Sequence, residues 1–142
     1  MSPLDKETIQ KRLLKLRQII SSLHLYAQET QKNFITDSML SDASMYQLTI
    51  GIEIVIDIGN HILSESFQKS AEDYTAVLQL LGEVGIAPKK MIEANKNMAG
   101  FRNILVHDYI EVDIKKVYKY LQKAPDVFQQ FADCYIKFLD KH

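Results

Sequence analysis

The sequence contains few cysteines, prolines and glycines. Among its 142 residues are one cysteine, three prolines and five glycines, and there is no tryptophan. The single cysteine, Cys134, excludes an intrachain disulfide and any zinc site built on paired cysteines, which fits a reducing cytoplasm. Proline and glycine are the residues that most often interrupt helices. Their scarcity therefore predicts long helices joined by short loops.

The sequence also lacks a strong excess of charge and a long apolar run. Seventeen Lys and Arg residues against eighteen Asp and Glu residues give a formal net charge of -1, unlike the basic balance of general nucleic-acid-binding proteins. Any contact with RNA must therefore be local. The most apolar window, residues 48–63, is too short to span a bilayer and contains Glu53 and Asp57. The N-terminal segment mixes both signs of charge, so no secretory signal is expected there.

Apolar residues recur every three or four positions along most of the chain. This period predicts an all-α bundle of about five helices in a single domain, residues 1–142. The first helix is expected from about residue 5 to 32, and the second at roughly 42–64. Residues 33–44 read as the connection between them. β-branched residues are dense in the second segment, but its length and the spacing of its polar residues favour a helix over a strand.

Residues that typically begin and end helices divide the rest of the chain. A short third helix is expected after a capping box that starts at Ser70, and Gly82 or Gly85 should end it. Pro88 suits the first turn of a fourth helix that continues to about residue 107. Asp113 is the expected N-cap of the last helix, which Pro125 should kink or break. Cys134 falls at helical spacing among aromatic residues of this helix and is predicted to lie in the core.

Residues 101–109, FRNILVHDY, place polar side chains within an apolar run. Burying an unpaired charge is costly, so Arg102, Asn103, His107 and Asp108 need partners, water or a function. A guanidinium can hold phosphate oxygens, and an imidazole can transfer protons near neutral pH. Together these groups can cleave RNA without a metal. The structural alternative is that Arg102 lies over neighbouring apolar side chains and that His107 caps the helix C-terminus.

Spacing alone does not bring the two residues together. Arg102 and His107 are five positions apart, so on one ideal helix their side chains point about 140° away from each other. They converge only if the helix loosens after Val106, or if two copies of the segment meet across a dimer axis.

The segment from Arg102 to Tyr109 resembles the R-x4-H-x-Y motif of the HepT-like toxins of the HEPN superfamily. Three neighbouring stretches also resemble that family, in its second helix, its short helix with the following turn, and the start of its last helix. They are IEIVIDIGNHIL, DYTAVLQLLGEVGIAP and YIEVDIKKVYKYL. The resemblance implies a HEPN-type bundle that acts as a homodimeric, metal-independent endoribonuclease without a cofactor. It further implies a cytoplasmic toxin of a type VII-like toxin–antitoxin pair, whose partner is an MntA-like nucleotidyltransferase antitoxin.

The same resemblance implies roles for individual residues. Arg102 and His107 match the catalytic pair, and Asn103 matches a supporting polar position. Tyr109 matches the tyrosine to which the antitoxin transfers AMP. Asp57 matches an acid that could orient Arg102 through a charge-assisted hydrogen bond. The implied reaction is attack of a ribose 2′-hydroxyl on its own phosphate, which leaves a 2′,3′-cyclic phosphate.

The sequence departs from the family at the start of the second helix, where an Arg is usual. Met45, Tyr46 and Gln47 stand there, which puts in doubt an additional basic contact to RNA. Two other functions stay open. In the first, the chain is a non-catalytic helical binding subunit of a minimal nucleotidyltransferase. In the second, AMP transfer onto Tyr109 is itself the biological output. The intact R-x4-H pair favours the nuclease.

Two further patterns carry weaker functional signals. Glu53, Asp57 and His61 share a helix face, but metal-binding spacings such as Glu-x-x-His are absent. We therefore interpret them as a stripe that is solvated or that lines the groove beside the motif. The stretch KKVYKYLQK, residues 115–123, mixes lysines with tyrosines in a way that could follow an RNA strand. A charged, exposed helix face explains the same residues and is the preferred interpretation.

Overall fold

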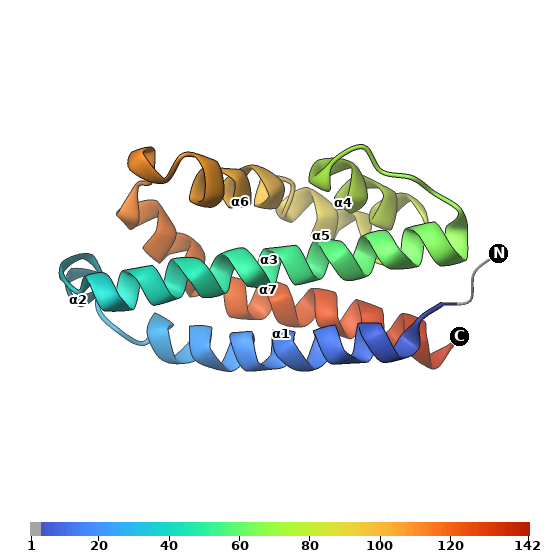
Figure 1. The fold of residues 1–142 in the computed structure, drawn as a ribbon, viewed down its shortest axis with the longest axis horizontal. Coiled ribbons are helices and arrows are strands. Elements are labelled where there is room, and N and C mark those ends of the chain that lie inside the picture. Colours follow the sequence, from blue (N-terminus) through green and yellow to red (C-terminus); the bar gives the residue numbers. More distant parts are fainter. Residues whose placement is uncertain (1–3) are drawn as a thin grey trace.

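A computed structural model describes residues 4–142, apart from the side chain of Tyr109. These residues form an all-α bundle, as predicted, in which the three longest helices run along one another (Figure 1). The long helices are α1 (Lys6–Ala27), α3 (Ser38–Phe67) and α7 (Ile114–Asp140). The shorter elements are α2 (Gln31–Thr36), α4 (Tyr74–Glu83), α5 (Lys89–Ala94), α6 (Met98–His107) and the 3-10 helix η1 (Tyr109–Glu111).

The hydrophobic core lies where α1, α3 and α7 face one another, and α4 and α6 pack against α3 from the other side. At the centre of α3, the ring of Phe128 from α7 occupies the space that a Cβ on Gly51 would need. Farther along, the buried hydroxyl of Tyr135 donates to the carbonyl of Val55 at 2.7 Å, and burial raises the pKa of this hydroxyl far above its ordinary range. Apolar packing and one buried hydrogen bond therefore fix α7 against α3.

The second predicted helix is confirmed as a helix, but the prediction that residues 33–44 form a connection is wrong. Thr30 caps α2 by accepting a hydrogen bond from the backbone N–H of Asn33 at 3.1 Å. Asp37 then caps α3 by accepting from the N–H groups of Met39 and Leu40 at 3.0 and 3.2 Å. Because each helix start has its own side-chain cap, the chain resumes a helix at once instead of forming a loop.

The region between α3 and α7 differs from prediction in two places. The N-cap of α4 is Asp73, which accepts from the N–H of Ala76 at 2.8 Å, and Ser70 lies outside the helix. The predicted fourth helix is divided into α5 and α6. The side chain of Asn95 donates to the carbonyl of Met91 at 2.8 Å and ends α5 there. Such local side-chain bonds compete with the helical hydrogen-bond pattern. Gly85, with φ +82°, follows α4, as expected of a residue that ends a helix.

The last helix begins where predicted, because Asp113 accepts from the N–H of Lys115 at 3.0 Å. The expected break at Pro125 does not occur, since α7 continues to Asp140 with Pro125 buried inside it. Packing on both sides of the proline outweighs the lost backbone hydrogen bond. Cys134 is only half-buried, so its placement in the core was wrong. It lies at the edge of the core, and its Sγ is 4.0 Å from Sδ of Met91.

From Leu4 to the end of the chain, no helix combines the length and the apolar character that are needed to cross a membrane.

Candidate active site at the end of α6

An acidic side chain of α3 holds Arg102 in place. Nε of Arg102 donates to Oε1 of Glu53 at 3.1 Å, and Nη2 donates to the same oxygen in a second charge-assisted hydrogen bond. The two side chains are only 16% and 29% exposed. The ring of Tyr74, at the start of α4, faces the guanidinium, with its centroid 5.0 Å from Cζ. The ion pair and the cation–π contact together restrict the guanidinium to one orientation.

The acid that binds Arg102 is Glu53, whereas the family resemblance implied Asp57. The two acids share a face of α3 and lie one helical turn apart, and the position of α6 along α3 brings Arg102 to the earlier one. Asp57 is exposed at the surface, yet partial desolvation raises the pKa of its carboxyl group. The charges of Arg12 and Arg102 oppose this shift, and that of Glu53 adds to it. Asp57 therefore influences Arg102 only through its charge.

Arg102 and Asn103 border a solvent-open cavity of about 350 Å³, together with Asp73, Tyr74 and Thr75. Oδ1 of Asn103 accepts from Nη1 of Arg102 at 3.3 Å. Hydrogen bonds to the described side chains thus use three of the five guanidinium N–H groups. The arginine keeps donors that can reach an anion entering the cavity.

His107 is the last residue of α6 and is exposed. The helix does not loosen after Val106, because α6 remains helical through His107 and the N–H of Asp108 still donates to the carbonyl of Ile104 at 3.1 Å. Within one protomer, Arg102 faces α3 and α4, and His107 lies on a different side of α6. The structure therefore does not bring the predicted catalytic pair together in a single chain.

The predicted AMP acceptor, Tyr109, is placed by its backbone alone. Tyr109 begins η1, two positions after His107, and its side chain lies outside the described part of the chain.

Sequence reasoning missed three features of this site. Glu53 was assigned to a stripe that is solvated or lines the groove beside the motif, but it was not identified as the partner of Arg102. No role was assigned to Tyr74 from the sequence. Large apolar side chains within and just after the motif are also unusually exposed: Ile104 by 44%, Val106 by 36% and Ile110 by 85%. Exposed apolar side chains of this size can contribute to an interaction surface.

The lysine-rich stretch at the start of α7 is a charged face, as preferred from the sequence. Lys115, Lys116, Lys119 and Lys123 are exposed. The hydroxyl of Tyr118 donates to the carbonyl of Glu29 at 2.6 Å, and the buried ring of Tyr120 lies 4.4 Å from that of Phe101. Since both tyrosines are engaged within the bundle, they are not placed to stack on bases.

The stripe of Glu53, Asp57 and His61 does not form a shared centre. Glu53 binds Arg102, and Nε2 of His61 accepts from the backbone N–H of Asp5 at 3.2 Å. Among residues 4–142, no group of three His, Cys, Asp or Glu side chains is arranged to hold a metal ion.

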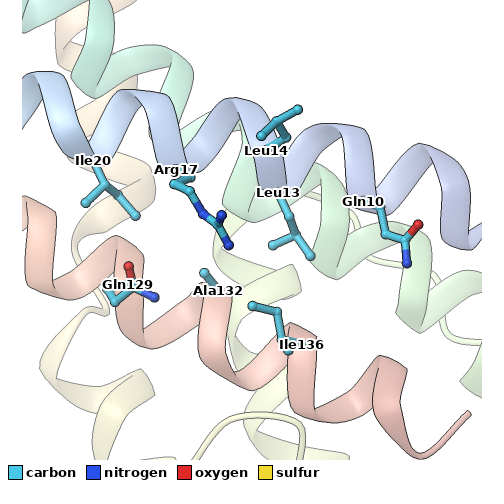
Figure 2. Close-up of a pocket in the computed structure, with 8 residues that line it drawn as sticks. All are labelled: Gln10, Leu13, Leu14, Arg17, Ile20, Gln129, Ala132 and Ile136. Carbon is cyan, nitrogen blue, oxygen red and sulfur yellow. The ribbon is translucent and has the colours of Figure 1, made fainter.

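A separate groove of about 280 Å³ lies between α1 and α7 (Figure 2). Its lining is mainly apolar, and Arg17 is the charged side chain among the residues that form it. The other lining residues are Gln10, Leu13, Leu14, Ile20, Gln129, Ala132 and Ile136. Because the groove contains no residue of the motif and no acid–base group, it is not the candidate active site.

An all-α bundle that presents an R-x4-H motif at the end of a short helix defines a HEPN-type protein. The family model described as "Ribonuclease HepT-like" matches residues 9–134, and the chain belongs to this family. It is 33% identical to the mRNA nuclease HepT of Shewanella oneidensis over 104 residues, which cover 70% of this chain and 75% of that protein.

Solved structures agree with this assignment. The fold is similar to that of the tri-AMPylated Shewanella oneidensis HEPN toxin in complex with MNT antitoxin. The TM-score is 0.80, the identity is 25%, and the match covers 94% of this chain and 97% of that one. The fold is also similar to that of the Bacillus subtilis cytosolic protein YutE, of unknown function, with a TM-score of 0.83 and 21% identity. That match covers 99% of this chain and 94% of the other, and it concerns the fold alone.

Proposed function

We propose that this chain is the endoribonuclease toxin of a toxin–antitoxin pair, a single domain in which Arg102 and His107 are the catalytic residues. Membership of the HepT-like ribonuclease family supports the activity. The observation that carries the assignment to this site is the fixed guanidinium of Arg102 beside a solvent-open cavity. A largely covered, oriented arginine with unused N–H donors suits a phosphate whose charge increases during the reaction.

In the proposed reaction, the imidazole of His107 takes the proton from a ribose 2′-hydroxyl. The 2′-oxygen forms a bond to the adjacent phosphorus, and the bond from phosphorus to the 5′-oxygen breaks. The leaving 5′-oxygen receives a proton from an imidazolium or from water. Arg102 donates hydrogen bonds to the non-bridging oxygens, and Asn103 helps to orient the guanidinium. The products are a 2′,3′-cyclic phosphate and a 5′-hydroxyl, and no metal takes part.

A homodimer would complete this site. Arg102 and His107 occupy different sides of α6, so one protomer alone does not present them to the same phosphate. Ile104, Val106 and Ile110 offer exposed apolar area beside the motif. A two-fold contact through these residues would bring each Arg102 towards the His107 of the other copy.

The relatives support control by a partner transferase. The structurally similar Shewanella toxin is tri-AMPylated and bound to MNT antitoxin. We place the corresponding modification on Tyr109, two positions after His107, with an MntA-like nucleotidyltransferase as the enzyme. AMP at this position would add bulk and negative charge where an RNA phosphate must bind, which would block cleavage.

The decisive experiment is cleavage of a structured RNA in EDTA by wild type, His107→Ala and Arg102→Ala, after intact-mass measurement excludes added AMP. Arg17→Ala and His24→Ala are matched controls, because both residues are exposed on α1, outside the site. We expect cleavage with a cyclic-phosphate product in wild type and both controls, and none in the two site variants. If unmodified wild type is as inert as the site variants on every RNA, the chain is a binding subunit of a nucleotidyltransferase.

A further inference from the structure

A large cleft lies at the end of the bundle opposite His107. It has a volume of about 680 Å³ and is formed by the turn after α4, the start of α5 and the ends of α3 and α7. Figure 1 places these ends together, far from the end of α6. The residues proposed for catalysis take no part in its lining.

The charged side chains of this cleft favour an anion. Lys89, Lys137 and Lys141 line it and are exposed, and Glu83 is the one acidic residue in the lining. Lys137 and Lys141 are four positions apart at the end of α7, so their ammonium groups lie on one face of the chain. The cleft is therefore locally basic in a protein whose formal net charge is -1.

An aromatic stack stands beside these lysines. The ring of His142 lies on that of Phe138, with centroids 4.1 Å apart and planes at 17°. Nδ1 of His142 is also 2.9 Å from the carbonyl oxygen of Phe138, which fixes the ring, and Phe67 packs on Phe138 at 5.9 Å. His142 is exposed, so a flat ring can add to the stack. A nucleobase is such a ring, and stacking of bases on aromatic side chains does not depend on their sequence.

Two other surfaces of the bundle lack this combination of lysines with an aromatic ring that is free to stack. The lysines of residues 115–123 flank Tyr118 and Tyr120, which are engaged within the bundle. The groove of Figure 2 is apolar and contains a single charged residue. The cleft between α4 and α7 instead combines lysines for a phosphate with an accessible aromatic face for a base. This combination matches a nucleotide.

We propose that this cleft is a second RNA-binding site, which holds a nucleotide of the substrate at a distance from the cleavage site. The proposal rests on the ribonuclease function proposed above. From Glu53, which orients Arg102, to Phe67, in the cleft, α3 rises about 21 Å at 1.5 Å per residue. An RNA several nucleotides long spans this distance, so the cleft would select for longer strands and contribute to their affinity.

The test is equilibrium binding of a fluorescent single-stranded RNA to full-length, unmodified protein in a His107→Ala background, which prevents cleavage. The variant is Lys137→Glu with Lys141→Glu. The matched control is Lys11→Glu with Lys15→Glu, because these lysines are also exposed and four positions apart on a long helix. A second variant, His142→Ala, removes the stacking ring without changing the lysines. Thermal melting checks that all variants remain folded.

We expect the Lys137→Glu, Lys141→Glu variant to bind RNA at least tenfold more weakly than the control. Loss of two phosphate contacts should also reduce the slope of log affinity against log salt by about 1.4, at about 0.7 per contact for single strands. His142→Ala should weaken binding about fivefold or more. Equal affinity of the lysine variant and its control would overturn the proposal.

Two further outcomes separate the possible ligands and the two proposals. If AMP binds in the cleft and loses affinity in the lysine variant while RNA does not, the site serves a free nucleotide and the RNA site is wrong. The measurement does not require catalysis. Binding that depends on Lys137 and Lys141 would support the second site even if wild type cleaved no RNA. Conversely, cleavage by wild type with no effect in these variants would reject only the second site.

Discussion

Helices α6 and α7 differ in how much of each helix is buried in the bundle. Eleven of the 27 residues of α7 are buried, whereas Met98 and Ala99 are the buried residues among the ten of α6. The helix that carries the motif is held by these two residues, by the ion pair of Arg102 with Glu53 and by the contact of Phe101 with Tyr120. From this difference we expect that α7 provides stability and that α6 presents the proposed catalytic residues, so substitutions in the two helices should affect different measurements.

The largest effects should come from one substitution in each helix. His107→Ala should reduce RNA cleavage about 10²- to 10⁴-fold, because it removes the proposed proton acceptor. Its melting temperature should stay near that of wild type, since His107 is exposed. Phe128→Ala should instead lower the free energy of unfolding by about 3–5 kcal/mol by leaving a cavity in the core. A large loss of stability in His107→Ala would show that α6 is part of the structural framework after all.

A smaller effect on cleavage is expected at Glu53. Glu53→Ala should reduce kcat up to about 100-fold, because a guanidinium displaced by about 1 Å loses much of its effect. Glu53→Gln keeps a hydrogen-bond acceptor for Arg102 and should restore part of the rate. Steady-state kinetics separates this effect on kcat from a change in KM. Equal rates for Glu53→Ala and wild type would mean that Glu53 does not position Arg102.

The same glycine substitution should have opposite effects in the core and on α6. A Cβ on Gly51 would overlap the ring of Phe128, so Gly51→Ala should destabilise the protein by about 1–3 kcal/mol. A Cβ on Gly100 meets no atom within 4 Å, so Gly100→Ala should stabilise the protein by about 0.5–1 kcal/mol. Urea denaturation measures both changes. Destabilisation by Gly100→Ala would imply that α6 packs more closely against its neighbours at Gly100 than the open space there indicates.

The smallest effect concerns Asp57 and pH. Its pKa is raised above the ordinary value of 3.8 in the folded protein, so the unfolded chain releases this proton at lower pH. The ionised carboxylate thus slightly destabilises the fold, and this effect appears as pH rises through the folded-state pKa. Asp57→Asn should raise the melting temperature a little at pH 7 and leave it unchanged near pH 3. The reverse dependence would contradict the desolvation of Asp57.

Much of the fold was predictable because its determinants are local. The apolar period located α1, α3 and α7, and the side chain of Asp113 marked the start of α7. The missed helix boundaries depend on which of several residues able to cap a helix forms the capping hydrogen bond. Asp37 and Asp73 were overlooked as N-caps, and the side chain of Asn95 interrupts a pattern that otherwise continues.

The motif could be identified from the sequence, but the side chains that contact Arg102 could not be predicted. Glu53 and Asp57 occupy the same stripe of α3, and the spacing of residues does not reveal which turn faces Arg102. That choice depends on how far α6 is displaced along α3, which the tertiary packing of Met98 and Phe101 determines. The cation–π contact with Tyr74 follows from the same packing.

Helices α1 and α7 lie side by side, although more than eighty residues separate them in the chain. Contacts between such distant segments form late, because a long stretch of chain must first be ordered. During synthesis on the ribosome, the apolar stripe of α1 has no partner from α7 until residues 114–140 have emerged. The motif, residues 102–109, is synthesised earlier. However, the packing of α3, which contacts α6, is completed only when α7 docks against it. The surroundings of the motif are therefore completed only after residues 114–140 have been synthesised.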